Sequence, residues 1–133
     1  MQNPADEDRD LQARLRRVLT ACAATGETPA YRDLAQRAAV PGPHGIHRLT
    51  LALEAMIRED HAAGRPLLAA LAVGRAQRGP DGRALPGRGF FHLLAELGRY
   101  DGPDHGPAAA ACHADEVQRA QAYWGSRGSS GGT

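Results

Sequence analysis

The sequence predicts a mainly α-helical, winged-helix-like domain that carries one small β-hairpin. Two observations predict this fold class. Apolar side chains recur at helical spacing along most of the chain, and a short apolar run followed by a glycine-rich stretch interrupts them. Three helices followed by a β-element is the order of a winged helix. We expect a disordered tail over 1–8, a single domain over 9–124 and a flexible tail over 125–133.

The first three helices follow from their apolar stripes. Residues 9–24 carry apolar side chains at i, i+4, i+7, i+8 and i+11, and Gly26 then ends the pattern. A short helix is predicted over 30–39, after Pro29. A turn rich in glycine and proline separates it from a longer helix over 45–63, so the pair predicts a helix-turn-helix.

The second half of the chain predicts the wing and two more helices. Pro66 opens an apolar run that ends at Val73, and its length and flanks favour a buried strand. Residues 74–89 hold five glycines, two prolines and four arginines, which is typical of a mobile loop or β-hairpin. Helices over 90–97 and 108–124 complete the domain. We expect one core, formed by Leu15, Val18, Leu19, Leu34, Leu49, Leu53, Leu71, Phe90 and Leu94.

Composition narrows the range of functions. No apolar run approaches the roughly 20 residues that a membrane span needs, and the acidic start lacks the apolar segment of a secretion signal. We therefore expect a cytoplasmic protein without a membrane partner. All sixteen basic residues are arginine, so no lysine is available for Schiff-base chemistry. The net charge is +1, but residues 61–99 carry six arginines against two acids and form a basic middle third.

The helix-turn-helix and the basic loop together predict DNA binding. Groove-reading helices contact bases with their N-terminal residues, and the helix dipole there favours phosphate. A glycine-rich loop with arginines can follow the phosphate backbone electrostatically. The candidate DNA-contacting residues are Tyr31, Arg32, His44, His47, Arg48, Arg75, Arg78, Arg83 and Arg88. We expect no cofactor and no metal, because the histidines and cysteines lack the paired spacing of zinc ligands.

Residues 28–98 resemble the DNA-binding C-terminal domain of alkyltransferase and alkyltransferase-like proteins. That family begins with a Tyr-x-x-Leu-Ala helix, as in residues 31–35, and has an early arginine in its recognition helix, which Arg48 matches. Pro66 stands before the apolar run, and residues 87–98 match the closing glycine-rich hairpin and its Leu-Leu helix. The resemblance implies a winged helix that enters the minor groove.

The resemblance does not extend to the family's reaction. The Pro-Cys-His-Arg motif has no counterpart, because the aligned stretch is the apolar segment 68–73 and neither cysteine is near it. We therefore expect DNA binding without alkyl transfer. Segments 64–68 and 86–91, with Tyr123 and Trp124, also look like parts of small prokaryotic proteins to which no function is assigned.

Two other functions stay open at this point. A protein-interaction module would use an aromatic surface that includes Phe91, Tyr100 and Trp124, since aromatic residues are enriched in binding hot spots. A small enzyme would use carboxylates and a histidine as general acid and base. The residues available for that chemistry are Glu59, His61, Glu96 and Glu116.

Overall fold

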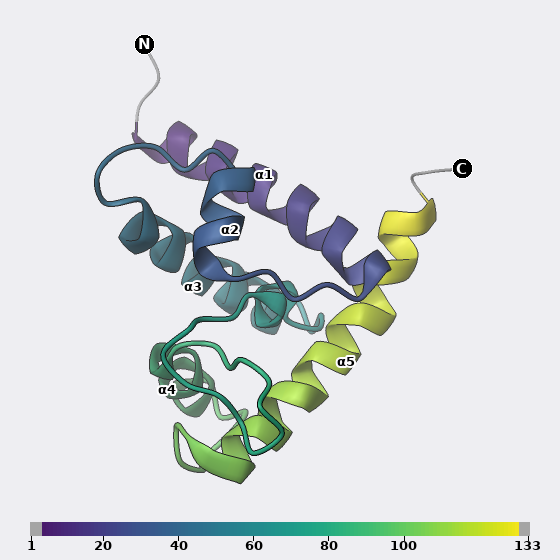
Figure 1. The fold of residues 1–133 in the computed structure, drawn as a ribbon. Coiled ribbons are helices and arrows are strands. Elements are labelled where there is room, and N and C mark those ends of the chain that lie inside the picture. The colour runs from purple at the N-terminus through teal and green to yellow at the C-terminus, as the bar shows by residue number, and fades with distance from the viewer. Residues whose placement is uncertain (1–3, 131–133) are drawn as a thin grey trace.

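The computed structural model describes the backbone of residues 4–130, and the side chains of 5–127 (Figure 1). This part of the chain is mainly helical. Its elements are α1 (Pro4–Thr25), α2 (Tyr31–Arg37), α3 (Gly45–Ala62), the 3-10 helix η1 (Leu68–Leu71), α4 (Arg88–Glu96) and α5 (Gly106–Ser130).

The core lies around η1, the short helix that the apolar run forms. All four residues of η1 are buried, and η1 contacts α1, α3 and α5. The helices α1 and α5 are the longest of these elements, and Figure 1 shows their C-terminal halves meeting. A Cβ on Gly125 would lie 2.9 Å from the carbonyl oxygen of Ala23, so glycine allows the two backbones to approach this closely.

The winged-helix prediction is wrong, because residues 4–130 contain no β-strand and therefore no hairpin wing. The predicted strand is instead η1, whose N–H groups bond locally: Ala70 donates to the carbonyl of Leu67 and Ala72 to that of Ala69. The apolar run is buried on all sides and rich in alanine. Its side chains therefore show no alternation of apolar and polar residues from which a strand could be told from a short helical turn.

The predicted hairpin over 74–89 is reduced to one isolated bridge between Arg78 and Ala84. Four backbone hydrogen bonds surround it, including Gly79 N–H to the carbonyl of Arg83 at 2.9 Å. Prolines at 80 and 86 cannot donate to a ladder, and five glycines lower the strand propensity of the segment. These residues form a loop that packs against other elements.

The ends of the chain differ from the predicted tail boundaries. Helix α1 begins at Pro4, inside the segment 1–8 predicted as a disordered tail, and α5 continues to Ser130, beyond the predicted domain end at 124. Residues 1–3 and 131–133 lie outside the described part of the chain.

A buried carboxylate ties the longest helices together. Asp60 of α3 is 0% exposed and accepts hydrogen bonds from the guanidinium groups of Arg16 and Arg65, at 3.1 and 2.9 Å for the shortest contacts. The Trp124 ring lies beside both cations, 5.8 Å from the Arg16 guanidinium carbon and 5.6 Å from that of Arg65. Its indole N–H donates to the carbonyl of Pro66 at 2.8 Å. These contacts fix the C-terminal end of α3 against α1 and α5.

Candidate functional site

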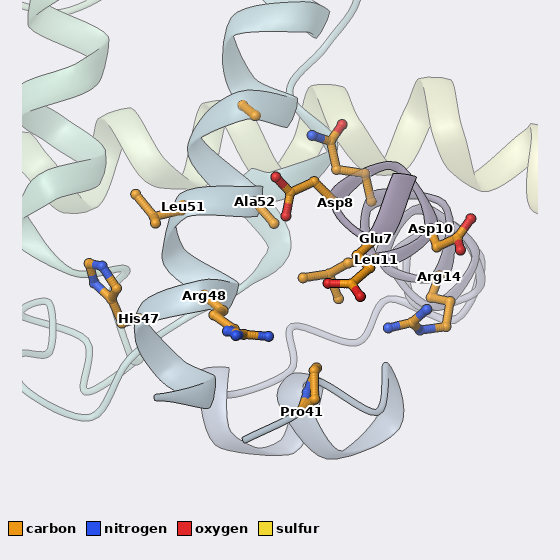
Figure 2. Close-up of a pocket in the computed structure, with 12 residues that line it drawn as sticks. Glu7, Asp8, Asp10, Leu11, Arg14, Pro41, His47, Arg48, Leu51 and Ala52 are labelled. Carbon is orange, nitrogen blue, oxygen red and sulfur yellow. The ribbon is translucent and has the colours of Figure 1, made fainter. Parts of the chain in front are cut away.

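The N-terminal halves of α1 and α3 enclose a groove of about 780 Å³ (Figure 2). Leu11 of α1 and Ala52 of α3 are buried and supply its apolar floor, and Ala55 extends that floor along α3. We call this hollow the α1–α3 groove.

The turn between α2 and α3 positions the groove. The turn begins with Ala39, whose φ of +54° lies in the left-handed region where alanine is uncommon. The backbone N–H of Ala39 donates a hydrogen bond to the carbonyl of Gln36. Gly42 then takes φ +84°, and prolines on both sides of it prevent the helix from continuing. The reversal places Pro41 at one end of the groove (Figure 2).

Opposite charges face one another across the α1–α3 groove. Arg48 points from α3 toward α1, where the carboxylates of Glu7 and Asp8 lie (Figure 2). None of these three exposed side chains forms a hydrogen bond or ion pair with another residue in the part of the chain that the structure describes. The groove therefore has unpaired charge of both signs above an apolar floor.

The outer face of α3 also exposes apolar side chains. Leu51 is 53% exposed and Ile46 is 47% exposed, and they are the exposed large hydrophobic residues of the described chain. In Figure 2, Leu51 and His47 point to the side of α3 that faces away from α1.

Three of the predicted DNA-contacting residues gather at one corner, and Arg48 points from α3 into the α1–α3 groove instead. Arg32, His44, His47 and Arg48 are all exposed, and the first three line a shallow hollow at the start of α3. The N-cap His44 makes no side-chain capping bond, and the first turn of α3 contains no acidic residue. The positive end of the helix dipole is therefore not neutralised by a local carboxylate.

The predicted wing arginines do not join that corner. Arg83 lies beside Asp81, with 3.5 Å between Nε and Oδ2, and both line another groove against α5. Arg88 begins α4 and lies 4.0 Å from Asp104. Without a hairpin, no common β-element carries these side chains to one surface. All four loop arginines are exposed, namely Arg75, Arg78, Arg83 and Arg88.

Tyr31 is half-buried and is hydrogen-bonded to two distant backbone segments. Its hydroxyl oxygen accepts a hydrogen bond from the backbone N–H of Gly87 at 2.9 Å, and its own N–H donates to the carbonyl of Val73 at 2.8 Å. Burial of the ring raises the pKa of the phenol. The Tyr-x-x-Leu-Ala pattern did not reveal this contact, because Gly87 is distant in the sequence.

The predicted aromatic interaction surface is largely inside the protein. Phe91 is 1% exposed and packs edge-on against Phe90, with ring centres 5.2 Å apart. Tyr100 is half-buried and donates its hydroxyl proton to the carbonyl of Pro103. Trp124 is held by Pro66 and two arginines, as described above. Phe91 is therefore enclosed in the core, whereas Tyr100 and Trp124 keep part of their surface exposed.

Three of the four candidate enzyme residues lie against arginines, and the fourth, Glu59, is exposed. Both oxygens of Glu116 accept hydrogen bonds from Arg99, at 3.0 and 2.9 Å, and the same guanidinium lies 3.2 Å from Nδ1 of His61. Glu96 pairs with Arg58. The two-point contact holds the Glu116 carboxylate against Arg99 and gives it a structural role.

The two thiols are poor nucleophiles at neutral pH because burial favours their neutral form, and the buried imidazole is bonded to the backbone. Burial is the largest cause that raises the pKa of Cys22 to about 11, with Glu27 adding to it. Burial likewise raises the pKa of Cys112 to about 11. Burial lowers the pKa of His113, whose Nε2 lies 2.8 Å from the carbonyl oxygen of Ala70.

The described residues contain no group of three or more His, Cys, Asp or Glu side chains placed to hold a metal ion. None of their helices is both long and apolar enough to cross a membrane.

Comparison of the chain with protein-family models, with curated proteins and with solved structures finds no match. The resemblance to alkyltransferase-like proteins therefore stays a prediction. The hairpin that the resemblance implied does not form in residues 4–130.

Proposed function

We propose that this protein is a non-catalytic binding module that receives a helical segment of a partner protein in the α1–α3 groove. One observation carries the proposal: Arg48 on one wall and Glu7 and Asp8 on the other are unpaired, above an apolar floor. Elsewhere in the molecule, buried charges are matched by internal partners, as for Asp60 and Glu116.

The groove defines the chemistry of that partner. An amphipathic helix docks by laying its apolar stripe into a hydrophobic groove, here over Leu11 and Ala52. Its flanks would carry an acidic residue toward Arg48 and a basic residue toward Glu7 and Asp8. A uniformly charged ligand would satisfy one wall and be repelled by the other, so charge complementarity favours a mixed-charge protein segment over a polyanion.

A site-specific photocrosslinker tests this proposal in cells of the source organism. We place it at Ala55 inside the groove and, as the matched control, at Ala122, which is exposed on α5. We expect a partner captured at Ala55 and not at Ala122, with the crosslink mapping to an amphipathic helical segment. Equal capture at both positions, or a crosslinked segment without an apolar stripe, would contradict the proposal.

A synthetic peptide of the mapped segment then gives the energetic test by calorimetry. Arg48→Glu should weaken its affinity at least about tenfold, because buried arginines rank among interface hot spots. Arg17→Glu is the matched control, since it makes the same charge change at an exposed arginine of α1 that does not line the groove. Equal affinities of the Arg48→Glu and parent proteins would remove the groove from the interface.

We also propose DNA binding as a second candidate function, located at the corner between α2 and α3. The specific observation is the uncapped start of α3 with the exposed side chains of Arg32, His44 and His47 around it. Backbone N–H groups and the dipole at such an end attract phosphate. The carboxylates of α1 oppose this function, because they lie across α3 from the corner and repel a phosphate backbone.

Fluorescence anisotropy with a generic duplex at low salt tests the second candidate. Binding should be in the micromolar range or weaker and fall steeply with salt. Arg32→Ala should lower the salt slope by about 0.9, the contribution of one phosphate contact. Arg58→Ala should change little, because Arg58 already pairs with Glu96. Asp8→Asn should strengthen binding by removing a repulsive charge. Undetectable binding at low salt would rule out DNA binding by this corner.

A further inference from the structure

A second, smaller hollow lies on the other flank of α3, between α3 and the start of α4. Its volume is about 110 Å³. Leu53, Ile57 and Ala69 give it an apolar lining, and the aromatic residues Tyr31 and Phe90 stand at its sides. We call it the α3–α4 hollow.

One carboxylate, that of Glu54, lines this otherwise mostly apolar space. Glu54 is half-buried and has no hydrogen bond or ion pair within the described chain. Its natural partner at i+4 is Arg58, but that guanidinium pairs with Glu96 of α4 instead. Arg88, at the start of α4, lies next to Asp104. Arg58 of α3 and Arg88 of α4 therefore each lie beside another carboxylate and not beside Glu54.

The size of the hollow limits what can enter it. A cavity of about 150 Å³ admits one benzene molecule, and pockets for drug-sized ligands measure about 300–1,000 Å³. At about 110 Å³, the α3–α4 hollow takes a single head group rather than a whole cofactor or nucleotide.

The lining determines the charge of that head group. A carboxylate in a mostly apolar surrounding attracts a cation, and the faces of Tyr and Phe rings attract cations as well. An anion would be repelled by Glu54, and a neutral hydrocarbon would leave its carboxylate unpaired. We propose that the α3–α4 hollow binds the head group of an organic cation, a guanidinium or an alkylammonium, through Glu54, Tyr31 and Phe90.

This site is independent of the α1–α3 groove and adds a ligand that the proposed function does not require. The cation can come from a free small molecule or from an arginine side chain of another protein. Both sources present the same head group to Glu54, so the experiment compares them directly.

NMR titration of the full ¹⁵N-labelled chain tests the site, with methylguanidinium chloride as the probe and sodium chloride keeping ionic strength constant. We expect saturable shifts of the Gly87, Gly89 and Phe90 amides, with a Kd of roughly 1–10 mM, the range that a few weak contacts give. Glu54→Gln should weaken binding at least about tenfold. Glu59→Gln, an exposed glutamate on the same helix, is the matched control and should bind like the parent.

A parallel titration with acetyl-Gly-Arg-Gly-amide distinguishes the two sources. Tighter binding of the peptide than of methylguanidinium assigns the site to a protein side chain, and the reverse order assigns it to a free small cation. Non-saturating shifts with both probes, or equal affinities for the parent and Glu54→Gln, would overturn the proposal. A thermal melt of Glu54→Gln confirms that the variant is folded before its affinity is read.

Discussion

The two ends of α3 differ in whether their charged side chains are buried and paired. At the C-terminal end, Asp60 is completely buried and bonded to Arg16 and Arg65. At the N-terminal end, Arg48 and His47 are exposed, and no described residue pairs with Arg48 or with Glu7 across the groove. The same helix thus contributes a structural charge cluster at one end and an open surface at the other.

This difference separates residues that hold the fold from residues available to a ligand. A charge removed from water is strongly destabilising unless it is paired, so the pairing of Asp60 is a condition of folding. An exposed charge is solvated by water and costs the fold little, whether or not it has a partner. Function is therefore expected at the N-terminal end of α3, and substitutions at the two ends should differ in their effects on stability.

The largest effect is expected for Asp60→Ala. Removing the carboxylate breaks its hydrogen bonds to Arg16 and Arg65 and leaves the buried N–H of Leu68 without its acceptor. A hydrogen bond to a charged group contributes about 1.5–3 kcal/mol, and less where the guanidinium is partly exposed as here, so the three losses together should cost about 3–5 kcal/mol. Denaturant melts measure the free energy of unfolding. A loss under about 1 kcal/mol would mean that water replaces the carboxylate and that the two ends of α3 do not differ as described.

Leu53→Ala and Leu51→Ala sharpen the comparison between the inner and outer faces of α3. Leu53 is buried in the core, so its truncation should cost about 2–5 kcal/mol of stability. Leu51 is exposed, and its truncation should change stability by less than about 0.5 kcal/mol. If both substitutions lowered the free energy of unfolding equally in denaturant melts, α3 would present a different face to the core from the one described.

Acid should destabilise the protein through His113. Burial lowers its pKa in the folded state below the ordinary value of 6.5, so the unfolded chain binds a proton more readily. Stability from this group is full above pH 6.5 and falls as the pH drops from there toward the folded pKa. Thermal melts across this range should show a smaller loss for His113→Gln than for the parent. Parallel profiles would show that His113 is already solvated in the folded state.

The smallest effect is expected for Arg48→Ala, which should change the free energy of unfolding by less than about 0.5 kcal/mol. The same substitution should weaken binding of a partner segment in the α1–α3 groove. A clear loss of stability in a thermal melt would show that Arg48 has a structural role. The two ends of α3 would then not differ in the way described.

Much of the helical framework could be predicted from sequence. The stripe containing Leu15 and Leu19 and the stripe containing Leu49 and Leu53 are buried as expected, because apolar spacing at i, i+3 and i+4 places side chains on one side of a helix. The corner formed by Arg32, His44 and His47 also follows from two helices and a short turn, which are local features.

The wing could not be predicted correctly, since the choice between strand and 3-10 helix for residues 68–71 depends on what surrounds them. These residues pack against α1, α3 and α5, and in the predicted strand only Val73 pairs with another segment, in an isolated parallel bridge to Ala30. The positions of Tyr31 and Trp124 depend in the same way on Gly87 and Pro66, which are distant in the sequence.

By itself, the amino-acid sequence determined the stripes of the helices and the turn that begins α3, because these depend on side-chain period and on the backbone limits of glycine and proline. Only the tertiary structure decided which charges would be buried and paired. Asp60 and Glu7 are both acidic residues on amphipathic helices, yet one has two arginines against it and the other faces an open groove. That distinction depends on which helices meet, and long-range packing alone supplies it.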